Sequence, residues 1–262
     1  MKHRPRKRFG QNFLRDDRVI ERIVACIAPQ ASDLLVEIGP GQAALTHPLL
    51  DSGAELHLVE IDRDLVTRLR DQFTGYDSVT VHECDALQAD LSEITRGRPF
   101  RLVGNLPYNI STPLIFHVLQ WHRQIRDMHF MLQKEVVERM AASPGSRTYG
   151  RLSVMTAYHC DVTPLFDVSP ESFSPVPAVH SSIVRLNPLA APRVDAGSLD
   201  NLERVVTTAF SQRRKTLRNG LRTLFTAEQI IAAGIDPAHR AEQLSLSQFA
   251  ALARSLSYDA DH

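Results

Sequence analysis

Four consecutive residues, Asn105, Leu106, Pro107 and Tyr108, directly follow a short apolar run, 102–104, that predicts a β-strand. The side-chain carbonyl of Asn105 and the main-chain carbonyl of Pro107, freed by the turn, could both accept hydrogen bonds from one –NH₂ group. The ring of Tyr108 offers a surface on which a base can stack. This combination suggests chemistry on the exocyclic amine of a flat base. The same residues would also suit a strand that ends in a proline turn beside a core tyrosine.

A second candidate site begins where a predicted strand, 34–38, runs into a turn that contains Gly39 and Gly41. Glycines there let the backbone approach a ligand at the carboxyl edge of a sheet, where open α/β sheets bind their ligands. The turn is not the dinucleotide fingerprint, because Ala44 occupies the place of its third glycine. It is not a phosphate-binding loop either, because no Lys-Ser/Thr pair follows. By itself this turn is weak evidence for a nucleotide-like ligand.

Carboxylates stand at the ends of the next two predicted strands. Glu60 follows the glycine turn by about twenty residues, the spacing at which an acid can accept both hydroxyls of a ribose and repel an added 2′-phosphate. Asp85 follows the third strand and can accept a hydrogen bond from an adenine amino group. Either acid alone would suit a turn or a helix cap. In this order, with Asn105 after the fourth strand, they predict strand ends that converge on an adenosine-shaped ligand.

Alternating strands and helices must position these residues. Apolar spacing predicts a helix at 65–73 between two of the strands. Such alternation predicts an α/β fold with a Rossmann-like parallel sheet, right-handed crossovers and helices on both faces. Two runs without an obvious helix between them, 160–168 and 182–186, predict an antiparallel pair at the sheet edge, and the prolines of 173–179 predict an extended loop near the site. The strands of the sheet are expected at 34–38, 56–59, 79–81, 102–103 and 128–132.

A change in composition at 187–197, which holds two prolines and a glycine, predicts a linker between two domains. We therefore expect a larger domain over 1–187, with a basic N-terminal arm, and a small helical domain over 188–262. Ser247 is the expected cap of the last helix. Helices of the second domain are expected at 199–210, 215–225, 227–233 and 247–256.

The formal net charge of zero conceals a separation of charge along the chain. Residues 1–15 hold six basic side chains and no acid, whereas residues 33–93 hold thirteen acids and three arginines, a net of −10. Acid-free basic clusters suggest surfaces that bind a polyanion, although any single run of charge is more often a solvated face. The second basic cluster comprises Arg213, Arg214, Lys215, Arg218 and Arg222.

Composition excludes several classes of protein. The three cysteines are far apart and form no C-x-x-C pair, which argues against a disulfide framework and favours a reducing cytoplasm. The basic N-terminus leads into no signal-peptide core, and no apolar stretch is long enough to span a bilayer. The eleven histidines show no metal-ligand spacing, so we expect no metal site.

The whole chain resembles the bacterial small-subunit ribosomal RNA adenine N6-dimethyltransferases, a family of S-adenosyl-L-methionine-dependent enzymes. One departure is Ala43, where many members of the wider fold carry a third glycine, and it raises a question about helix packing rather than about cofactor binding. The resemblance covers both predicted domains. The matching segments are 7–14, 37–41, 59–62, 85–87, 104–111, 173–181 and 210–217.

The resemblance implies roles for individual residues. Gly39 would pass the methionine portion of the cofactor, Glu60 would hold its ribose, and Asp85 would meet its adenine. Asn105 would lie between the cofactor and the target base. The whole cofactor site would comprise Asn12, Leu14, Gly39, Glu60, Asp85 and Asn105. The catalytic residues would be Asn105, Leu106, Pro107 and Tyr108, and the RNA would be bound by Tyr108, Phe173, Arg213, Arg214, Lys215 and Arg218.

The activity implied is N6-dimethylation of two adjacent adenosines in a hairpin loop near the 3′ end of small-subunit (16S) rRNA, during ribosome biogenesis. The expected partners are that rRNA and the immature small subunit, bound by a cytoplasmic monomer through a helical RNA-binding domain. One alternative is the related group that methylates large-subunit rRNA and confers antibiotic resistance. Both groups share the tetrapeptide 105–108, so it does not distinguish them, whereas segment 210–217 favours the small-subunit group. A different alternative is a ribosome-assembly factor whose main role is binding.

Overall fold

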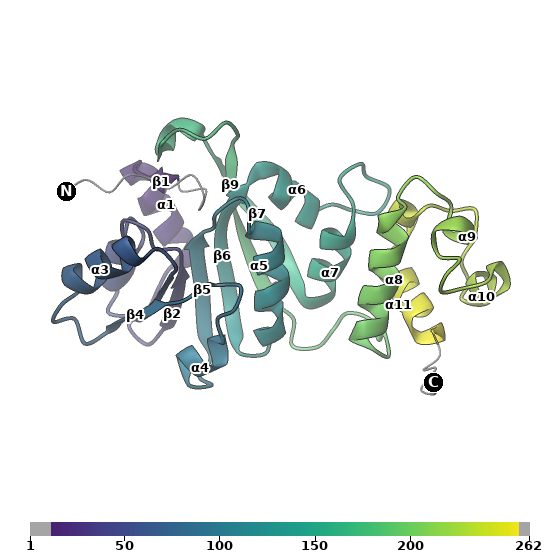
Figure 1. Ribbon diagram of the computed structural model, residues 1–262, viewed down its shortest axis with the longest axis horizontal. Helices are drawn as coiled ribbons and strands as arrows, with labels where there is room; N and C mark the ends of the chain where they lie inside the picture. Colours follow the sequence, from purple (N-terminus) through teal and green to yellow (C-terminus); the bar gives the residue numbers. More distant parts are fainter. Residues whose placement is uncertain (1–11, 257–262) are drawn as a thin grey trace. The chain divides into compact units, whose positions relative to one another are not determined.

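The computed structural model describes residues 12–256, which build a seven-stranded sheet of order β4-β3-β2-β5-β6-β9-β7. In Figure 1, α5 lies in front of this sheet and α1 behind it, so helices cover both faces as predicted. The basic N-terminal arm, apart from its last residues, lies outside the described residues. The strands are β1 (Phe13–Leu14), β2 (Leu34–Ile38), β3 (Glu55–Glu60), β4 (Val79–Glu83), β5 (Phe100–Asn105), β6 (Ile125–Gln133), β7 (Cys160–Val168), β8 (Phe173–Ser174) and β9 (Ser181–Pro188).

Three helices of the sheet-bearing unit begin at an aspartate cap. Asp16, Asp62 and Asp90 each accept hydrogen bonds from backbone N–H groups in the first turn of the helix that follows, which satisfies donors that the helix itself cannot. The helices are α1 (Asp17–Ile27), α2 (Thr46–Leu50), α3 (Arg63–Gln72), α4 (Leu91–Thr95), α5 (Ser111–Val118), α6 (Lys134–Met140), α7 (Arg151–His159), α8 (Leu199–Ser211), α9 (Leu217–Gly220), α10 (Ala227–Ala232) and α11 (Leu246–Ser255), with single 3₁₀ turns η2 (Leu119–Trp121), η3 (Pro170–Ser172) and η4 (Ala241–Gln243).

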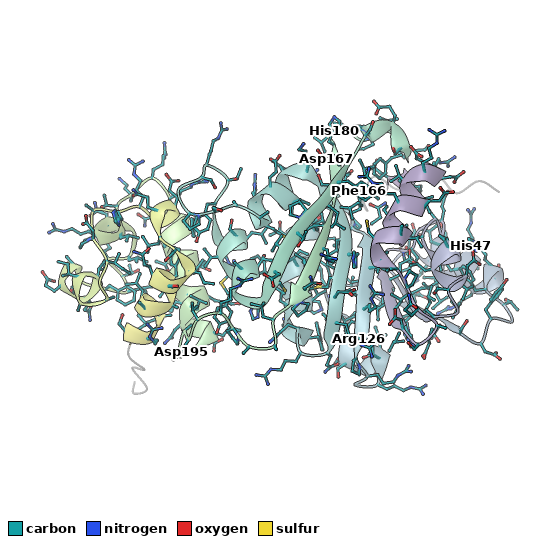
Figure 2. The ribbon with its side chains drawn as sticks, turned by 180° about the vertical axis from the view of Figure 1, so that it is seen from behind. His47, Arg126, Phe166, Asp167, His180 and Asp195 are labelled. Atoms are coloured by element: carbon teal, nitrogen blue, oxygen red, sulfur yellow. The ribbon has the colours of Figure 1, made fainter. Side chains whose placement is uncertain are left out.

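The strand order places a switch point between β2 and β5. The chain runs outward through β3 and β4 and then returns, so that β5 pairs with the other side of β2; the pairs among β2 to β6 are parallel. Such switch points are where open α/β sheets bind ligands, at the carboxyl ends of the strands. At the edge, β9 neighbours β7, so the two runs predicted to pair there do lie side by side, and β9 also pairs antiparallel with β6. Figure 2 shows Asp167 and His180 at one end of the sheet and Arg126 at the other.

Within the described residues, the chain divides into two compact units, one of 12–137 with 163–188 and one of 138–162 with 189–256. The second unit therefore takes in α7, which precedes the predicted linker. It contains α8, α10 and α11 close to their predicted bounds. None of the helices within residues 12–256 has the length and apolar character needed to cross a membrane.

Two predictions for the second unit were wrong. The helix expected at 215–225 is only α9. It cannot begin before Leu217, because Thr216 is extended and pairs with Arg240 in an isolated β-bridge, and Asn219 and Gly220 are weak helix formers. Ser247 does not cap α11. The cap is Ser245, which forms a reciprocal capping box with Gln248.

The two strands at the switch point come unusually close at Gly104. A Cβ atom placed on Gly104 would lie 2.6 Å from the main-chain oxygen of Ile38 and 3.0 Å from Cδ2 of Leu106. Only glycine allows this spacing, since no real Cβ atom comes that near to backbone. The next residue along each strand is Gly39 or Asn105, so the close approach brings these two site residues together.

Glu37, in the middle of this region, is a carboxyl group buried inside the sheet. Its Oε2 accepts a 2.7 Å hydrogen bond from the hydroxyl of Thr46. Burial raises the pKa of Glu37 to about 7; the Thr46 hydroxyl opposes the rise and the nearby Glu60 carboxylate adds to it.

We expect Gly104→Ala to lower the free energy of unfolding by about 1–3 kcal/mol, because the added methyl group must push β2 and β5 apart. Urea unfolding followed by circular dichroism measures this. Gly220→Ala is the matched control, since its Cβ would meet nothing nearer than 4.0 Å and it lies in α9. Equal losses for the two variants would contradict the close approach.

The stability of the protein should depend on the charge of Glu37. Its folded-state pKa of about 7 lies above the ordinary value of 4.5, so the folded state holds the proton more tightly than the unfolded state. Stability should therefore fall as the pH rises from about 4.5 to about 7, by up to about 3 kcal/mol. Glu37→Gln should flatten this slope in unfolding experiments across that range, leaving only the part that the raised pKa of Glu60 contributes. Glu93→Gln, at an exposed position, should keep it; a wild-type slope in Glu37→Gln would refute the assignment.

Candidate active site

One pocket opens at the carboxyl ends of β2, β3, β4 and β5. Every residue predicted for the cofactor site lines this pocket, as does the whole tetrapeptide that follows β5. The geometric expectation that Glu60, Asp85 and Asn105 share one cavity is therefore met. The predicted residues that line it are Asn12, Leu14, Gly39, Glu60, Asp85, Asn105, Leu106, Pro107 and Tyr108.

The glycine turn after β2 lines the pocket with Gly39, Pro40 and Gly41. Gly39 and Gly41 have φ angles of 67° and 59°, in the left-handed region that other residues adopt only with strain. A Cβ on Gly41 would lie 3.1 Å from the ring of Phe13, so the turn leaves room for that ring and little more. Ala43 is also left-handed, with φ of 66°, and is buried. This conformation favours glycine, and it costs Ala43 about 1 kcal/mol.

Glu60 is held in one orientation by three backbone groups. Its Oε1 accepts hydrogen bonds from the N–H groups of Ile61 (3.0 Å) and Asp62 (2.9 Å), and its Oε2 accepts one from Gly41 (3.3 Å). Burial raises the pKa of Glu60, while these hydrogen bonds oppose the rise. The carboxylate is thus fixed between the strand end and the glycine turn, where it can accept hydrogen bonds from hydroxyl groups.

Asp85 uses one oxygen for local structure and keeps the other available. Its Oδ1 accepts a 2.9 Å hydrogen bond from the N–H of Leu87, and no described residue donates to Oδ2. Ile61 lines the same pocket with a side chain that is 44% exposed. Burial raises the pKa of the neighbouring Cys84 thiol, which keeps it in the neutral form. A flat heterocycle with an amino group would find both apolar contact and an acceptor here.

The side chain of Asn105 is oriented by the N-terminal segment. Its Nδ2 donates a 3.1 Å hydrogen bond to the main-chain carbonyl of Asn12. Because only the NH₂ end of an amide can bond to a carbonyl, this contact fixes which end of the side chain is which. The segment is itself held by pairing of β1 with β8 and by a 2.8 Å hydrogen bond from the N–H of Arg15 to the carbonyl of Ser172. No described residue donates to Oδ1 of Asn105, which remains an open acceptor.

The carbonyl of Pro107 is occupied, in contrast to our expectation. It accepts hydrogen bonds from the N–H of Ile110 (3.1 Å) and from the hydroxyl of Ser111 (3.0 Å), which use both lone pairs and start α5. No described residue donates to the carbonyl of Leu106, one residue earlier in the same turn. The second open acceptor beside Asn105 is therefore Leu106, not Pro107.

Tyr108 is a half-buried ring held by one hydrogen bond. Its hydroxyl lies 2.7 Å from Oγ of Ser181, a fully buried residue at the start of β9. Burial raises the pKa of Tyr108, and the Ser181 hydroxyl opposes that rise. The phenol is therefore neutral and its ring is anchored at the edge of the sheet where the pocket opens.

The remaining predicted residues do not line the pocket. Phe173 is 3% exposed and packs in a core cluster with Leu14 and the α1 residues Ile23 and Ile27. Its predicted contact with a base stays a prediction and would require the side chain to leave this cluster. The predicted RNA-binding residues Arg213, Arg214, Lys215 and Arg218 belong to the second unit.

Sequence reasoning missed Phe13, Ile61 and Ser181. Ile61 carries the clearest signal, because an isoleucine between two acids at a strand end is an apolar side chain where solvent exposure is expected. Phe13 and Ser181 gave none, since their partners are far away in the chain. Within residues 12–256, no three histidine, cysteine or acidic side chains are grouped so as to hold a metal ion.

Comparison with known proteins agrees with this geometry. The model of the family "Ribosomal RNA adenine dimethylase" matches residues 2–257. The relatives named "Ribosomal RNA small subunit methyltransferase A" include that of Methylococcus capsulatus, 55% identical over 257 residues (98% of this chain and 100% of that protein). The Pseudomonas aeruginosa protein of the same name is 54% identical over 256 residues, covering 97% and 96% of the two chains.

Two solved structures have the same fold. A dimethyladenosine transferase from Plasmodium falciparum superposes with a TM-score of 0.76 at 26% identity, covering 92% of this chain and 95% of that one. The 23S rRNA methyltransferase ErmE superposes with a TM-score of 0.72 at 27% identity, covering 94% and 99%. The predicted fold class is thus confirmed. With a family match over almost its whole length, the chain belongs to the ribosomal RNA adenine dimethylases, and it is an S-adenosylmethionine-dependent rRNA adenine dimethyltransferase.

Proposed function

We propose that the protein dimethylates N6 of two adjacent adenosines in a hairpin loop near the 3′ end of small-subunit (16S) rRNA. The observation that carries this proposal is the pair of open acceptors, Oδ1 of Asn105 and the Leu106 carbonyl, in the same pocket as Glu60 and Asp85. The choice of the small subunit is supported by relatives of that name at 54–55% identity, against 27% for the 23S rRNA enzyme ErmE.

The residues of the pocket suit S-adenosylmethionine. Glu60 would accept the ribose hydroxyls, Oδ2 of Asp85 would accept the adenine amino group, and the turn at Gly39 would pass the methionine portion. When bound, the cofactor supplies an electrophilic methyl group on a sulfonium. The fixed Glu60 carboxylate and the apolar contact of Ile61 need no rearrangement to take up these roles, because backbone hydrogen bonds already hold the carboxylate.

The protein's task at the target base is to make the amine nucleophilic. The lone pair of N6 is delocalised into the adenine ring while the amine stays planar. In the first transfer, Oδ1 of Asn105 and the Leu106 carbonyl accept the two N–H bonds and draw them out of the ring plane, which localises that lone pair. In the second transfer the amine keeps a single N–H, which one of the two acceptors holds. Each transfer releases one N6 proton to solvent. Tyr108, anchored by Ser181, would stack on the base. Alignment and proximity then supply most of the acceleration, with no covalent enzyme intermediate.

The substrate must present an unstacked adenosine, because a base inside a helix cannot enter such a pocket. A hairpin loop meets this requirement. We propose that the second unit binds the rRNA through its basic cluster, residues 213–222, and that the protein acts as a cytoplasmic monomer on the immature small subunit.

The decisive test is incubation of the protein with labelled S-adenosylmethionine and small subunits that lack the modification, followed by mass analysis of the nucleosides. We expect N6-dimethyladenosine in two adjacent positions of the 16S rRNA. Large subunits serve as the comparison substrate. A product on large-subunit RNA alone would support the antibiotic-resistance type instead.

Asn105→Ala should lower kcat by about 100-fold or more, because one of the two acceptors that align the amine is lost. Affinity for S-adenosylhomocysteine, measured by calorimetry, should change far less, since Glu60 and Asp85 keep their contacts. Full turnover to the normal product in this variant would exclude Asn105 from the mechanism.

Tyr108→Ala should reduce kcat/KM by a factor that corresponds to about 1–3 kcal/mol, the value of a lost stacking contact. Tyr108→Phe keeps the ring and loses only the hydrogen bond to Ser181, so the loss should be about 0.5–1.5 kcal/mol. Ser181→Ala should match Tyr108→Phe, and the double variant should add little to either. Fully additive losses would show that the two hydroxyls act separately.

A further inference from the structure

Arg213 differs from its neighbours in the basic cluster because its charge is already paired. Its Nε donates a 2.8 Å hydrogen bond to Oε2 of Glu242 in η4, and its terminal nitrogen donates to the main-chain carbonyl of Arg147. Arg214, Lys215 and Arg218 are exposed, and no acid among the described residues forms an ion pair with them. Because two protein acceptors already use its N–H groups, Arg213 has fewer donors available for a phosphate than Arg214, Lys215 and Arg218 have.

Through the Arg147 carbonyl, Arg213 contacts the loop 141–150, which joins α6 to α7. Glu242 also holds this loop, since its main-chain carbonyl accepts a 2.7 Å hydrogen bond from the N–H of Gly145. Arg213 and Glu242 thus contact the loop at two points, Gly145 and Arg147, and contact each other. The pair ties together the loop, the turn η4 and the start of the basic cluster.

The far end of the loop is anchored by aromatic packing. Tyr149 is buried, with its ring edge-on to Phe210 at 6.0 Å, and Phe210 in turn packs 5.7 Å from Phe249. Between these anchors the loop forms consecutive turns, with hydrogen bonds from Ser146 N–H to Ser143 and from Tyr149 N–H to Ser146. The side chain of Arg147 stays exposed on this ordered loop. The structure therefore presents a cation from residues 141–150 next to the cations of the cluster.

We propose that the ion pair of Arg213 with Glu242 is a positioning device that makes loop 141–150 part of the RNA-binding surface, with Arg147 as its phosphate contact. The proposal rests on the proposed function, because it takes the polyanion bound by the second unit to be rRNA. It divides the basic cluster by role. Arg214, Lys215 and Arg218 bind phosphates directly, whereas Arg213 acts through the loop.

Removing the Glu242 carboxylate distinguishes this proposal from a simple effect of charge, because the two predict opposite changes in RNA affinity. If the cluster acted only by its summed charge, removing the Glu242 carboxylate would strengthen RNA binding, since one repulsive charge disappears. If the pair positions the loop, the same change releases the loop and weakens binding. The two accounts therefore predict opposite effects of one substitution.

Glu242→Gln should weaken binding to purified small subunits that lack the modification by about tenfold at about 0.1 M salt, and should lower the salt slope by about one, the loss of a single phosphate contact. Arg147→Gln should give the same loss and slope. The matched control is Glu228→Gln, an exposed acid near Arg218 with no contact to the loop. Its removal should leave binding unchanged or slightly tighter. Equal or tighter binding by Glu242→Gln would overturn the proposal.

Hydrogen exchange of peptide 141–150 separates a released loop from an unfolded domain. Exchange there should quicken in Glu242→Gln and Arg213→Gln and stay as in the wild type in Arg214→Gln, while α8 keeps its protection in all three. Unchanged exchange in the loop of Glu242→Gln would also overturn the proposal. Failure of the wild type to methylate small subunits would count against the proposed function, whereas the sign of the Glu242→Gln effect on binding tests the positioning device.

Discussion

The close approach of β2 and β5 at Gly104 is the constraint on which the site depends. With no side chain at this point, the two parallel strands end side by side, and the turn at Gly39 opens beside the tetrapeptide that begins with Asn105. The residues that we propose for the cofactor and those that we propose for the target base thus belong to one edge of the sheet. A methyl donor and an acceptor amine held this way meet without any movement of domains, which is the condition for catalysis by alignment.

Much of the sheet could be predicted from the sequence, because period and composition report local structure. The β-branched runs predicted all five parallel strands, and the order of Glu60, Asp85 and Asn105 after successive strands placed them at one edge. What failed depended on contacts between distant segments. The segment after Lys215 looks helical on its own, but Thr216 is extended and pairs with Arg240, so the helix begins only at Leu217 and forms a single turn.

The site was predictable in its residues and less so in its atoms. Residue types identified Asn105 and a carbonyl in the next turn, but only the structure shows that Ile110 and Ser111 occupy the Pro107 carbonyl and that Leu106 keeps its own open. Likewise, the basic run 213–222 predicts a surface that binds a polyanion. Its first residue, Arg213, is nevertheless paired with Glu242, an acid 29 residues later. Coordinates are needed to tell which acceptors are occupied and which stay open, because each acceptor has a limited number of lone pairs.

Ala43 has a consequence for how this chain can diverge from its relatives. Its methyl group lies in the core while its backbone is left-handed, so the turn after β2 bears a small standing strain. Loss of the methyl would relieve the strain and leave a small void in the core, two effects of similar size and opposite sign. Branched residues have no such route, because their side chains clash with a left-handed backbone. A branched residue at this position would therefore combine backbone strain with overpacking of the core.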